Sequence, residues 1–177
     1  SSIGRDAEGH ALITACEEMG IDCDHVYRSD DLPTDRYMAI EDANGLIAAI
    51  ADVHSLETTE NNVIAPLISG PFGTPEAPFS GMISLDGNLT QSLLEHSAVS
   101  PRFAGCDICV APASPGKADR LLPLLIRGRA LLYVNLEEAG LLCQTEYHTA
   151  AEAAQALLAK GARRVLVTNG ARPACDA

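Results

Sequence analysis

Tryptophan is absent from the sequence, aromatic residues are few, and positive charge is scarce. Aspartate and glutamate outnumber lysine and arginine by 24 to 12, and no basic stripe with interleaved aromatics occurs anywhere. The resulting net charge of -12 repels polyanions, so we expect no nucleic-acid partner. A small phosphorylated ligand remains compatible with this charge, because local backbone N–H groups and one or two side chains can hold it.

Long apolar runs are also lacking. The longest, such as Ala130–Val134, fall far short of the roughly 20 residues that a helix needs to cross a bilayer. The N-terminus has no basic segment followed by an apolar one, so we expect no membrane partner and a cytoplasmic location. With 47% apolar and 20% charged residues, the composition is that of a soluble globular domain with a real core.

The cysteines and histidines lack the spacing of a metal site. Cys106 and Cys109 form a C-x-x-C pair, but a structural zinc site needs four ligands, and no second Cys or His pair has matching spacing. The other cysteines and the histidines are scattered along the chain: Cys16, Cys23, Cys143, Cys175, His10, His25, His54, His96 and His148. We therefore predict free thiols and no zinc site.

The first third of the chain contains one clear helical pattern. Apolar residues recur at i, i+3, i+4 and i+7 between Ala7 and Met19, and Gly20 supplies a left-handed end, which together predict a helix. From 57 to 80 the sequence is rich in Pro, Gly, Thr and Asn, with one apolar patch at Val63–Ile68. This composition predicts a loop with one short helix.

A β-hairpin is predicted between these two segments. Two extended arms, Tyr37–Ile40 and Leu46–Ile50, flank the turn dipeptide Asn44-Gly45. We expect one apolar face on this hairpin, which must be buried by the rest of the sheet, a ligand or a second subunit. The residues predicted on that face are Tyr37, Ala39, Leu46, Ala48 and Ile50.

The remainder of the chain alternates strand-like and helix-like segments. Strands are predicted at 82–85, 107–111, 130–134 and 164–168, and helices at 89–97, 117–126, 137–143 and 150–160. The last helix follows Thr149-Ala150-Ala151-Glu152, which has the sequence of a capping box. Strands separated by helices imply right-handed βαβ units, so the prediction is an α/β fold with a mostly parallel sheet flanked by helices.

Polar residues follow each of the four predicted strands. Ligands of parallel sheets bind outside the carboxyl ends of the strands, so these segments carry most of the functional information. We expect them to converge on one edge of the sheet. The segments are Asp86-Gly87-Asn88, Pro112–Lys117, Asn135–Glu138 and Thr168-Asn169-Gly170.

The ordered set of motifs resembles the PfkB-type, or ribokinase-like, carbohydrate kinases. Gly4-Arg5-Asp6-Ala7-Glu8-Gly9 resembles the G-x-D-x-x-G turn of that family, and Pro33-Thr34-Asp35-Arg36-Tyr37 with the hairpin looks like its β lid. The four strand-end segments are similar to successive family signatures, which finish at Val167-Thr168-Asn169-Gly170-Ala171. The lid and the Pro-x-Ser-x-x-Lys run at Pro112–Lys117 look most like the pseudouridine kinase branch.

This resemblance covers nearly the whole chain. It implies that residues 1–177 are part of one ribokinase-like kinase domain, with an antiparallel lid hairpin at about 34–54. It further implies an ATP-dependent phosphotransferase acting on a hydroxymethyl group, with ATP and Mg²⁺ as cofactors and pseudouridine as the acceptor. Another sugar or nucleoside kinase, for example one acting on ribose, and a non-catalytic ligand-binding or oligomerising remnant are the alternatives. A homodimer through the lid is part of the same expectation.

The resemblance assigns a nucleotide side to the site. Asn135-x-x-Glu138 matches the family's N-x-x-E motif, in which the glutamate acts on Mg²⁺ and phosphate through water. Thr168, Gly170 and Lys117 belong to the same side by resemblance. Each has a plainer interpretation: Asn135 caps a helix and Glu138 is its first-turn acid, Thr168 and Gly170 form a turn, and Lys117 is solvated at a helix start.

The acceptor side is assigned in the same way. Asn88 matches a position that faces sugar hydroxyls, and Asp86 precedes it at the strand end. Thr34 and Tyr37, with Arg36 between them, would cover the substrate and exclude water. The plainer interpretations are a turn residue for Asn88 and cross-strand pairing for the hairpin residues.

The catalytic segment of the family has no counterpart in this sequence. That segment is a G-A-G-D run whose aspartate removes the proton of the acceptor hydroxyl, and Gly170–Asp176 is no substitute because Pro173 interrupts it. The N-terminal strand with its Gly-Gly substrate loop is missing as well. We therefore expect an incomplete piece of a kinase, with no catalytic residue among those present and no base at Asp176.

Overall fold

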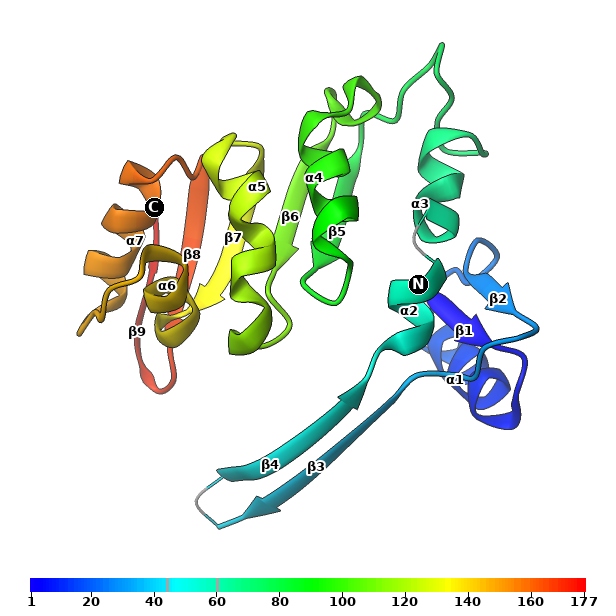
Figure 1. The fold of residues 1–177 in the computed structure, drawn as a ribbon, viewed down its shortest axis with the longest axis horizontal. Helices are drawn as coiled ribbons and strands as arrows, with labels where there is room; N and C mark the ends of the chain where they lie inside the picture. The colour runs from blue at the N-terminus through cyan, green and yellow to red at the C-terminus, as the bar shows by residue number, and fades with distance from the viewer. Residues whose placement is uncertain (44, 60) are drawn as a thin grey trace. The chain divides into compact units, whose positions relative to one another are not determined.

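The computed structural model describes residues 1–43, 45–59 and 61–177, and the chain forms two compact units, Ser1–Pro66 and Leu67–Ala177 (Figure 1). The first contains β1 (Ser2–Gly4), α1 (Ala7–Glu18), β2 (Tyr27–Ser29), β3 (Arg36–Asp42), β4 (Gly45–Asp52) and α2 (His54–Thr59), and α3 (Asn61–Ile68) spans the boundary.

The predicted first helix is confirmed as α1. Its N-cap is Asp6, whose carboxylate accepts a hydrogen bond from the backbone N–H of Gly9 at 2.8 Å. The helix ends at Met19, and Gly20 adopts a φ of +81°, as the sequence predicts. The strand before it, β1, pairs in parallel with β2 and was not predicted, because three-residue strands are too short to show an alternation.

The predicted hairpin is confirmed, but its two faces are not as expected. Met38 pairs with Ile50 and Ile40 with Ala48, whereas Tyr37 pairs with Ala51. A bulge between Ile40 and Glu41 causes this shift, because it places one extra residue in β4. Ala48 and Ile50 therefore share a face with Met38 and Ile40, not with Tyr37 and Ala39. The turn residue Asn44 and the side chain of Leu46 lie outside the described part of the chain.

Hydrogen bonds join the two ends of the hairpin at its base. They connect the segment just before β3 to α2, the helix that follows β4. The Asp35 carboxylate accepts hydrogen bonds from the N–H groups of Ser55 and Leu56, at 2.9 and 3.0 Å. The Ser55 hydroxyl donates to the carbonyl of Pro33 at 2.6 Å. These contacts cap α2, a helix that was not predicted because its capping residue comes 20 positions earlier.

The second unit is built on one five-stranded sheet. β5 (Met82–Asp86), β6 (Asp107–Ala111), β7 (Ala130–Asn135) and β8 (Arg164–Asn169) are parallel neighbours in this order, which confirms the predicted parallel sheet. β9 (Arg172–Asp176) adds an antiparallel edge strand that was not predicted. Pro173 has no N–H to donate, and it is tolerated because an edge strand forms backbone hydrogen bonds with a neighbour on one side only.

Helices pack against the face of this sheet that carries Val110, Leu132 and Val165, all of which are fully buried. The helical segments are α4 (Gln91–Val99), η1 (Pro101–Phe103), η2 (Pro115–Leu121), α5 (Leu122–Ile126), α6 (Leu136–Cys143) and α7 (Ala150–Ala159). In Figure 1, α4 to α7 lie on the viewer's side of the strands. The core between the two layers contains the buried leucines 94, 121, 124, 125, 142 and 157.

Two of the predicted helices begin differently in the structure. The helix predicted from Leu89 begins at Gln91, because Thr90 is the N-cap and accepts from the Leu93 N–H at 3.2 Å. The helix predicted over 117–126 is a 3₁₀ segment, η2, followed by the short α5. The six cysteines are unpaired. None of the helices in the described ranges is long and apolar enough to cross a membrane.

Candidate functional site

The polar segments after β5, β6, β7 and β8 lie along one edge of the sheet. The four strands are parallel and hydrogen-bonded in sequence order, so their carboxyl ends are neighbours. This confirms the predicted convergence. In addition, Asn135 at the end of β7 pairs in register with Thr168 at the end of β8.

The turn after β5 is fixed against the loop after β6. The Gly87 N–H donates to the carbonyl of Ala111 at 2.9 Å, and the Asn88 N–H donates to the Asp86 carboxylate at 2.8 Å. A Cβ atom on Gly87 would lie 2.1 Å from the carbonyl oxygen of Pro112, so only glycine fits there. Asp86 and Asn88 thus have a defined position at the sheet edge.

Lys117 contacts this turn. Its ammonium donates a hydrogen bond to the side-chain oxygen of Asn88 at 2.7 Å. From the same 3₁₀ segment, Arg120 donates to the carbonyls of Gly87 and Leu89 at 3.1 and 3.3 Å. Lys117 therefore lies with Asp86 and Asn88, while Asn135, Glu138, Thr168 and Gly170 line the cavities described below.

Asn135 and Glu138 form a capping box at the start of α6. The Asn135 side chain accepts from the Glu138 N–H, and the Glu138 carboxylate accepts from the Asn135 N–H, both at 2.8 Å. The plainer interpretation of this motif is therefore physically present. Burial raises the pKa of Glu138, the Asn135 N–H opposes this shift, and the neighbouring Glu137 adds to it. A cation beside Glu138 would offset the cost of burying its charge.

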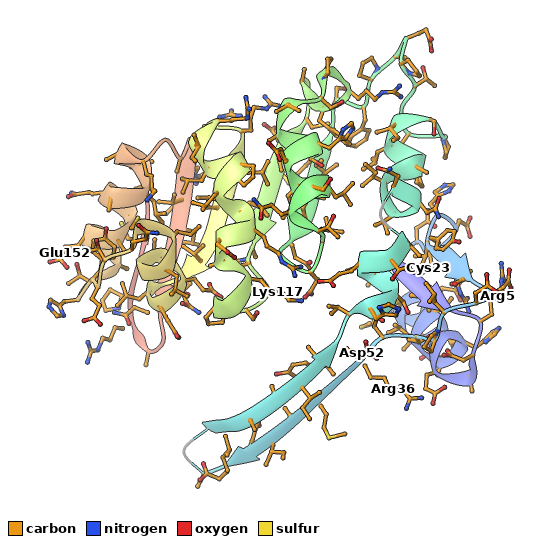
Figure 2. All side chains as sticks on the ribbon, in the orientation of Figure 1. Arg5, Cys23, Arg36, Asp52, Lys117 and Glu152 are labelled. Carbon is orange, nitrogen blue, oxygen red and sulfur yellow. The ribbon has the colours of Figure 1, made fainter. Side chains whose placement is uncertain are left out.

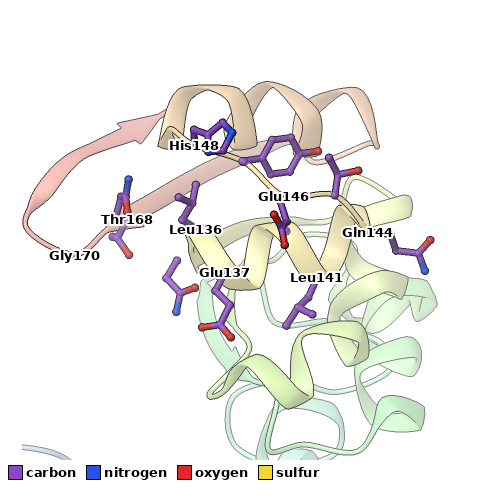
Figure 3. Close-up of a pocket in the computed structure, with 13 residues that line it drawn as sticks. Leu136, Glu137, Leu141, Gln144, Glu146, His148, Thr168 and Gly170 are labelled. Carbon is purple, nitrogen blue, oxygen red and sulfur yellow. The ribbon is translucent and has the colours of Figure 1, made fainter. Parts of the chain in front are cut away.

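A cavity of about 1010 Å³ opens beside this capping box (Figure 3). One wall comes from α6, including Leu136, Glu137 and Leu141, and a second comes from the loop 144–148. The ends of β7 and β8 close it with Asn135 and the segment 168–170. The volume is that of a site for a nucleotide-sized ligand.

A smaller hollow of about 310 Å³ adjoins the larger cavity. It is lined by Pro112, Ala113 and Glu138 among others, and it shares Asn135 and Thr168 with the larger cavity. The buried carboxylate therefore forms part of a wall instead of being sealed in the core. Among the described residues, no group of three or more acidic, histidine or cysteine side chains could bind a metal ion by itself.

Thr168 lies near the end of β8, and Gly170 lies in the turn that joins β8 to β9. Gly170 has a φ of +54°, which suits glycine at a turn, and both residues line the larger cavity. The turn brings β9 alongside β8 as its antiparallel partner. Asp176 of β9 accepts two hydrogen bonds from Arg164, at 3.0 and 2.7 Å, and this pairing lowers the pKa of Asp176.

The remaining predicted site residues, Thr34 and Tyr37, lie in the unit Ser1–Pro66. Thr34 is buried, and its hydroxyl and N–H both donate to Asp6. Tyr37 is 66% exposed on β3. Arg36 beside it forms an ion pair with Glu8 at 2.8 Å and pairs in register with Asp52 at the hairpin base (Figure 2).

Sequence reasoning missed the loop 144–148, which supplies a wall of the larger cavity. The loop turns at Gln144, which has a left-handed φ of 56°. Glycine or asparagine would have marked such a position, whereas glutamine gives no signal of it. The capping box at Thr149 marked only where the next helix begins.

The sheet, the helices on it and the hairpin define a ribokinase-like α/β fold. The chain belongs to the pfkB family of carbohydrate kinases, whose family model matches residues 1–175. Comparison with curated proteins gave no match.

Solved structures agree on the fold. A carbohydrate kinase from Agrobacterium tumefaciens matches with a TM-score of 0.75 at 22% identity, over 99% of this chain and 54% of its own. Ribokinase from Thermotoga maritima matches with a TM-score of 0.67 at 22% identity, over 99% of this chain and 55% of its own. Arabidopsis thaliana ribokinase complexed with ribose and ATP matches with a TM-score of 0.71 at 17% identity, over 99% of this chain and 56% of its own. The chain thus spans about half the length of these three kinases.

Proposed function

We propose that the chain is part of an ATP-dependent phosphotransferase that acts on a hydroxymethyl group of a sugar or nucleoside, with pseudouridine as the acceptor. The observation that carries this proposal is the N-x-x-E motif, Asn135 to Glu138, in the wall of two adjoining cavities at the carboxyl edge of a parallel sheet. That edge is where such sheets bind their ligands. Membership of the pfkB family supports the reaction class.

The larger cavity suits the nucleotide. Thr168 can donate its hydroxyl to a phosphate oxygen, and Gly170 allows the ligand to approach the backbone. The acidic residues Glu137 and Glu138 would repel bare phosphates. The site therefore requires a cation between these carboxylates and the phosphates. Glu138 is the residue that would bind hydrated Mg²⁺, and its buried position favours such a partner. When bound, ATP supplies the phosphoryl group and Mg²⁺ neutralises its charge.

Asp86 and Asn88, at the end of β5, would bind the acceptor further along the same edge of the sheet. Their carboxylate and amide groups match the hydroxyls of a polyol, which both donate and accept hydrogen bonds. The similarity of the Pro112–Lys117 run to pseudouridine kinases supports a nucleoside acceptor. The ribokinase bound to ribose and ATP supports the alternative, a kinase for ribose or another sugar.

The hairpin would act as the lid of this acceptor site. Tyr37 is available on it for contact, whereas Thr34 is engaged by Asp6 and would position the lid base instead of contacting the substrate. The exposed face formed by Met38, Ile40 and Ile50 would be covered in a homodimer. A catalytic base is not proposed among residues 1–177, since Asp176 is paired with Arg164.

The test is ATP-dependent phosphorylation of pseudouridine, ribose and adenosine by the full-length protein and by residues 1–177 alone. We expect turnover by the full-length protein with pseudouridine as the best acceptor, and none by residues 1–177. Absence of turnover by the full-length protein with every sugar and nucleoside tried would favour a non-catalytic binding role. A preference for ribose would keep the reaction class and reject the pseudouridine assignment.

A further inference from the structure

The loop after β6 holds an unusual backbone conformation. Ala113 has a φ of +67°, a left-handed value that alanine rarely adopts because its Cβ crowds the backbone. The segment that follows, η2, continues as a 3₁₀ helix for seven residues, although such helices seldom exceed three or four. Strained backbone of this kind persists where the surroundings impose it, and it concentrates at functional sites.

The strained loop delivers Lys117 to the turn after β5. Within the loop, the Lys117 N–H donates to the carbonyl of Ser114 at 3.0 Å, which holds the first turn of η2. The close approach of Gly87 to Pro112 sets the spacing between the two loops. In this geometry the half-buried lysine reaches the Asn88 side-chain oxygen at 2.7 Å.

This contact fixes the orientation of the Asn88 amide. An ammonium group can only donate, so the amide oxygen of Asn88 must face Lys117. The amide nitrogen then points to the Asp86 carboxylate, 3.5 Å away. The turn and η2 together therefore present a carboxylate acceptor from Asp86 and the remaining N–H donors of the Lys117 ammonium.

We propose that Lys117 is a positioning and specificity residue of the acceptor site, and not a nucleotide-binding residue. This inference rests on the proposed function. The paired carboxylate and ammonium recognise a ligand that donates at one atom and accepts at an adjacent one, such as a vicinal diol or the N–H and carbonyl of a cyclic amide. Lys117 keeps Asn88 and Asp86 in the arrangement that this recognition requires.

The chain offers a matched control, because Lys160 is its other lysine and lies exposed at the C-cap of α7. In the full-length protein, Lys117→Met should raise the KM for pseudouridine or ribose roughly tenfold or more, because a hydrogen bond to a charged group is lost. The KM for ATP and the melting temperature should stay at their wild-type values. Lys160→Met should change none of these quantities.

Two outcomes would overturn the inference while leaving the phosphotransferase in place. One is an unchanged acceptor KM in Lys117→Met, and the other is a raised KM for ATP, which would return Lys117 to the nucleotide side. A lower melting temperature together with raised KM values for both the acceptor and ATP would show a structural role instead.

Acetylation of the two lysines, followed by mass spectrometry, tests the inference without turnover. Pseudouridine or ribose should slow modification of Lys117 and leave that of Lys160 unchanged. If neither ligand protects Lys117, the inference is wrong even for an active kinase. If a ligand protects Lys117 but no ATP-dependent turnover occurs, the proposed reaction fails and the acceptor-site assignment stands.

Discussion

The carboxylate of Asp6 binds both polar donors of Thr34, a residue 28 positions further along the chain, with the backbone N–H at 2.7 Å and the hydroxyl at 2.5 Å. The same carboxylate caps α1. The glycines of the G-x-D-x-x-G turn permit this arrangement, because a Cβ on Gly4 would lie 2.7 Å from the Thr34 nitrogen and one on Gly9 would lie 2.2 Å from the Gly4 oxygen. The motif thus joins the first helix to the start of the hairpin.

Asp6 should stabilise the protein in a pH-dependent way. The hydrogen bonds from Thr34, followed by that from Gly9, lower the pKa of Asp6 to about 2. Since the folded pKa lies below the unfolded value, the stabilisation is fully present above the unfolded pKa and is lost as the pH falls through about 2. Asp6→Asn should therefore lower the urea midpoint at pH 7, and the deficit should shrink toward pH 2.

The control for this measurement is Asp24→Asn, an exposed aspartate in the same unit. It should leave the urea midpoint unchanged across the same pH range. A constant difference between wild type and Asp6→Asn from pH 7 to pH 2 would show that the titration of Asp6 is not coupled to folding.

Glu138→Gln should separate stability from activity. Glutamine can still complete a capping box, so the fold is retained. Burial raises the pKa of Glu138, so the protonated carboxyl stabilises the fold at low pH. This stabilisation is lost as the pH rises through the folded pKa. A neutral residue at position 138 should therefore maintain or raise the stability of the protein at pH 7. Loss of the charge should lower Mg²⁺ affinity roughly 10–100-fold, measured as the Mg²⁺ dependence of turnover in the full-length protein.

Glu152→Gln is the matched control, because Glu152 completes the other capping box, with Thr149 on α7. It should affect neither stability nor Mg²⁺ dependence. Normal Mg²⁺ dependence in Glu138→Gln would mean that Glu138 serves only as a helix cap, despite its place in the cavity wall.

The register of the hairpin predicts which substitutions break a homodimer. Ile50 is 68% exposed and pairs with Met38, while Ala49 pairs with Ala39 on the opposite face. Ile50→Glu should convert a dimer of the full-length protein into a monomer in sedimentation experiments, because it places a charge in an apolar contact. Ala49→Glu should leave the dimer intact. Equal effects of the two substitutions, or a monomeric wild type, would reject the lid as the dimer contact.

Features encoded by neighbouring residues were predictable from the sequence. The capping box at Thr149 and the turn at Gly20 depend on residues within one helical turn, and both are found as expected. The parallel sheet followed from the alternation of strand and helix patterns. The polar strand ends could then be located from the general rule that ligands bind at the carboxyl edge.

Features set by long-range contacts were not predictable. α2 depends on a cap from Asp35, and the 3₁₀ form of η2 depends on the packing of its loop. The apolar face of the hairpin was predicted for a regular register, and the bulge at Ile40 moved Ile50 to the other face. Such a bulge moves every later residue of the strand to the opposite face of the hairpin, and the local composition gives no sign of it.

The hydrogen bonds that Asp35 and Ser55 form at the hairpin base also have a mechanical consequence. With both strand ends fixed to α2, the two strands cannot slide past one another without breaking these hydrogen bonds. The seven residues of β3 then form a lever arm of about 24 Å at roughly 3.4 Å per residue. A small rotation of α2 would therefore be amplified into a large displacement of the hairpin tip.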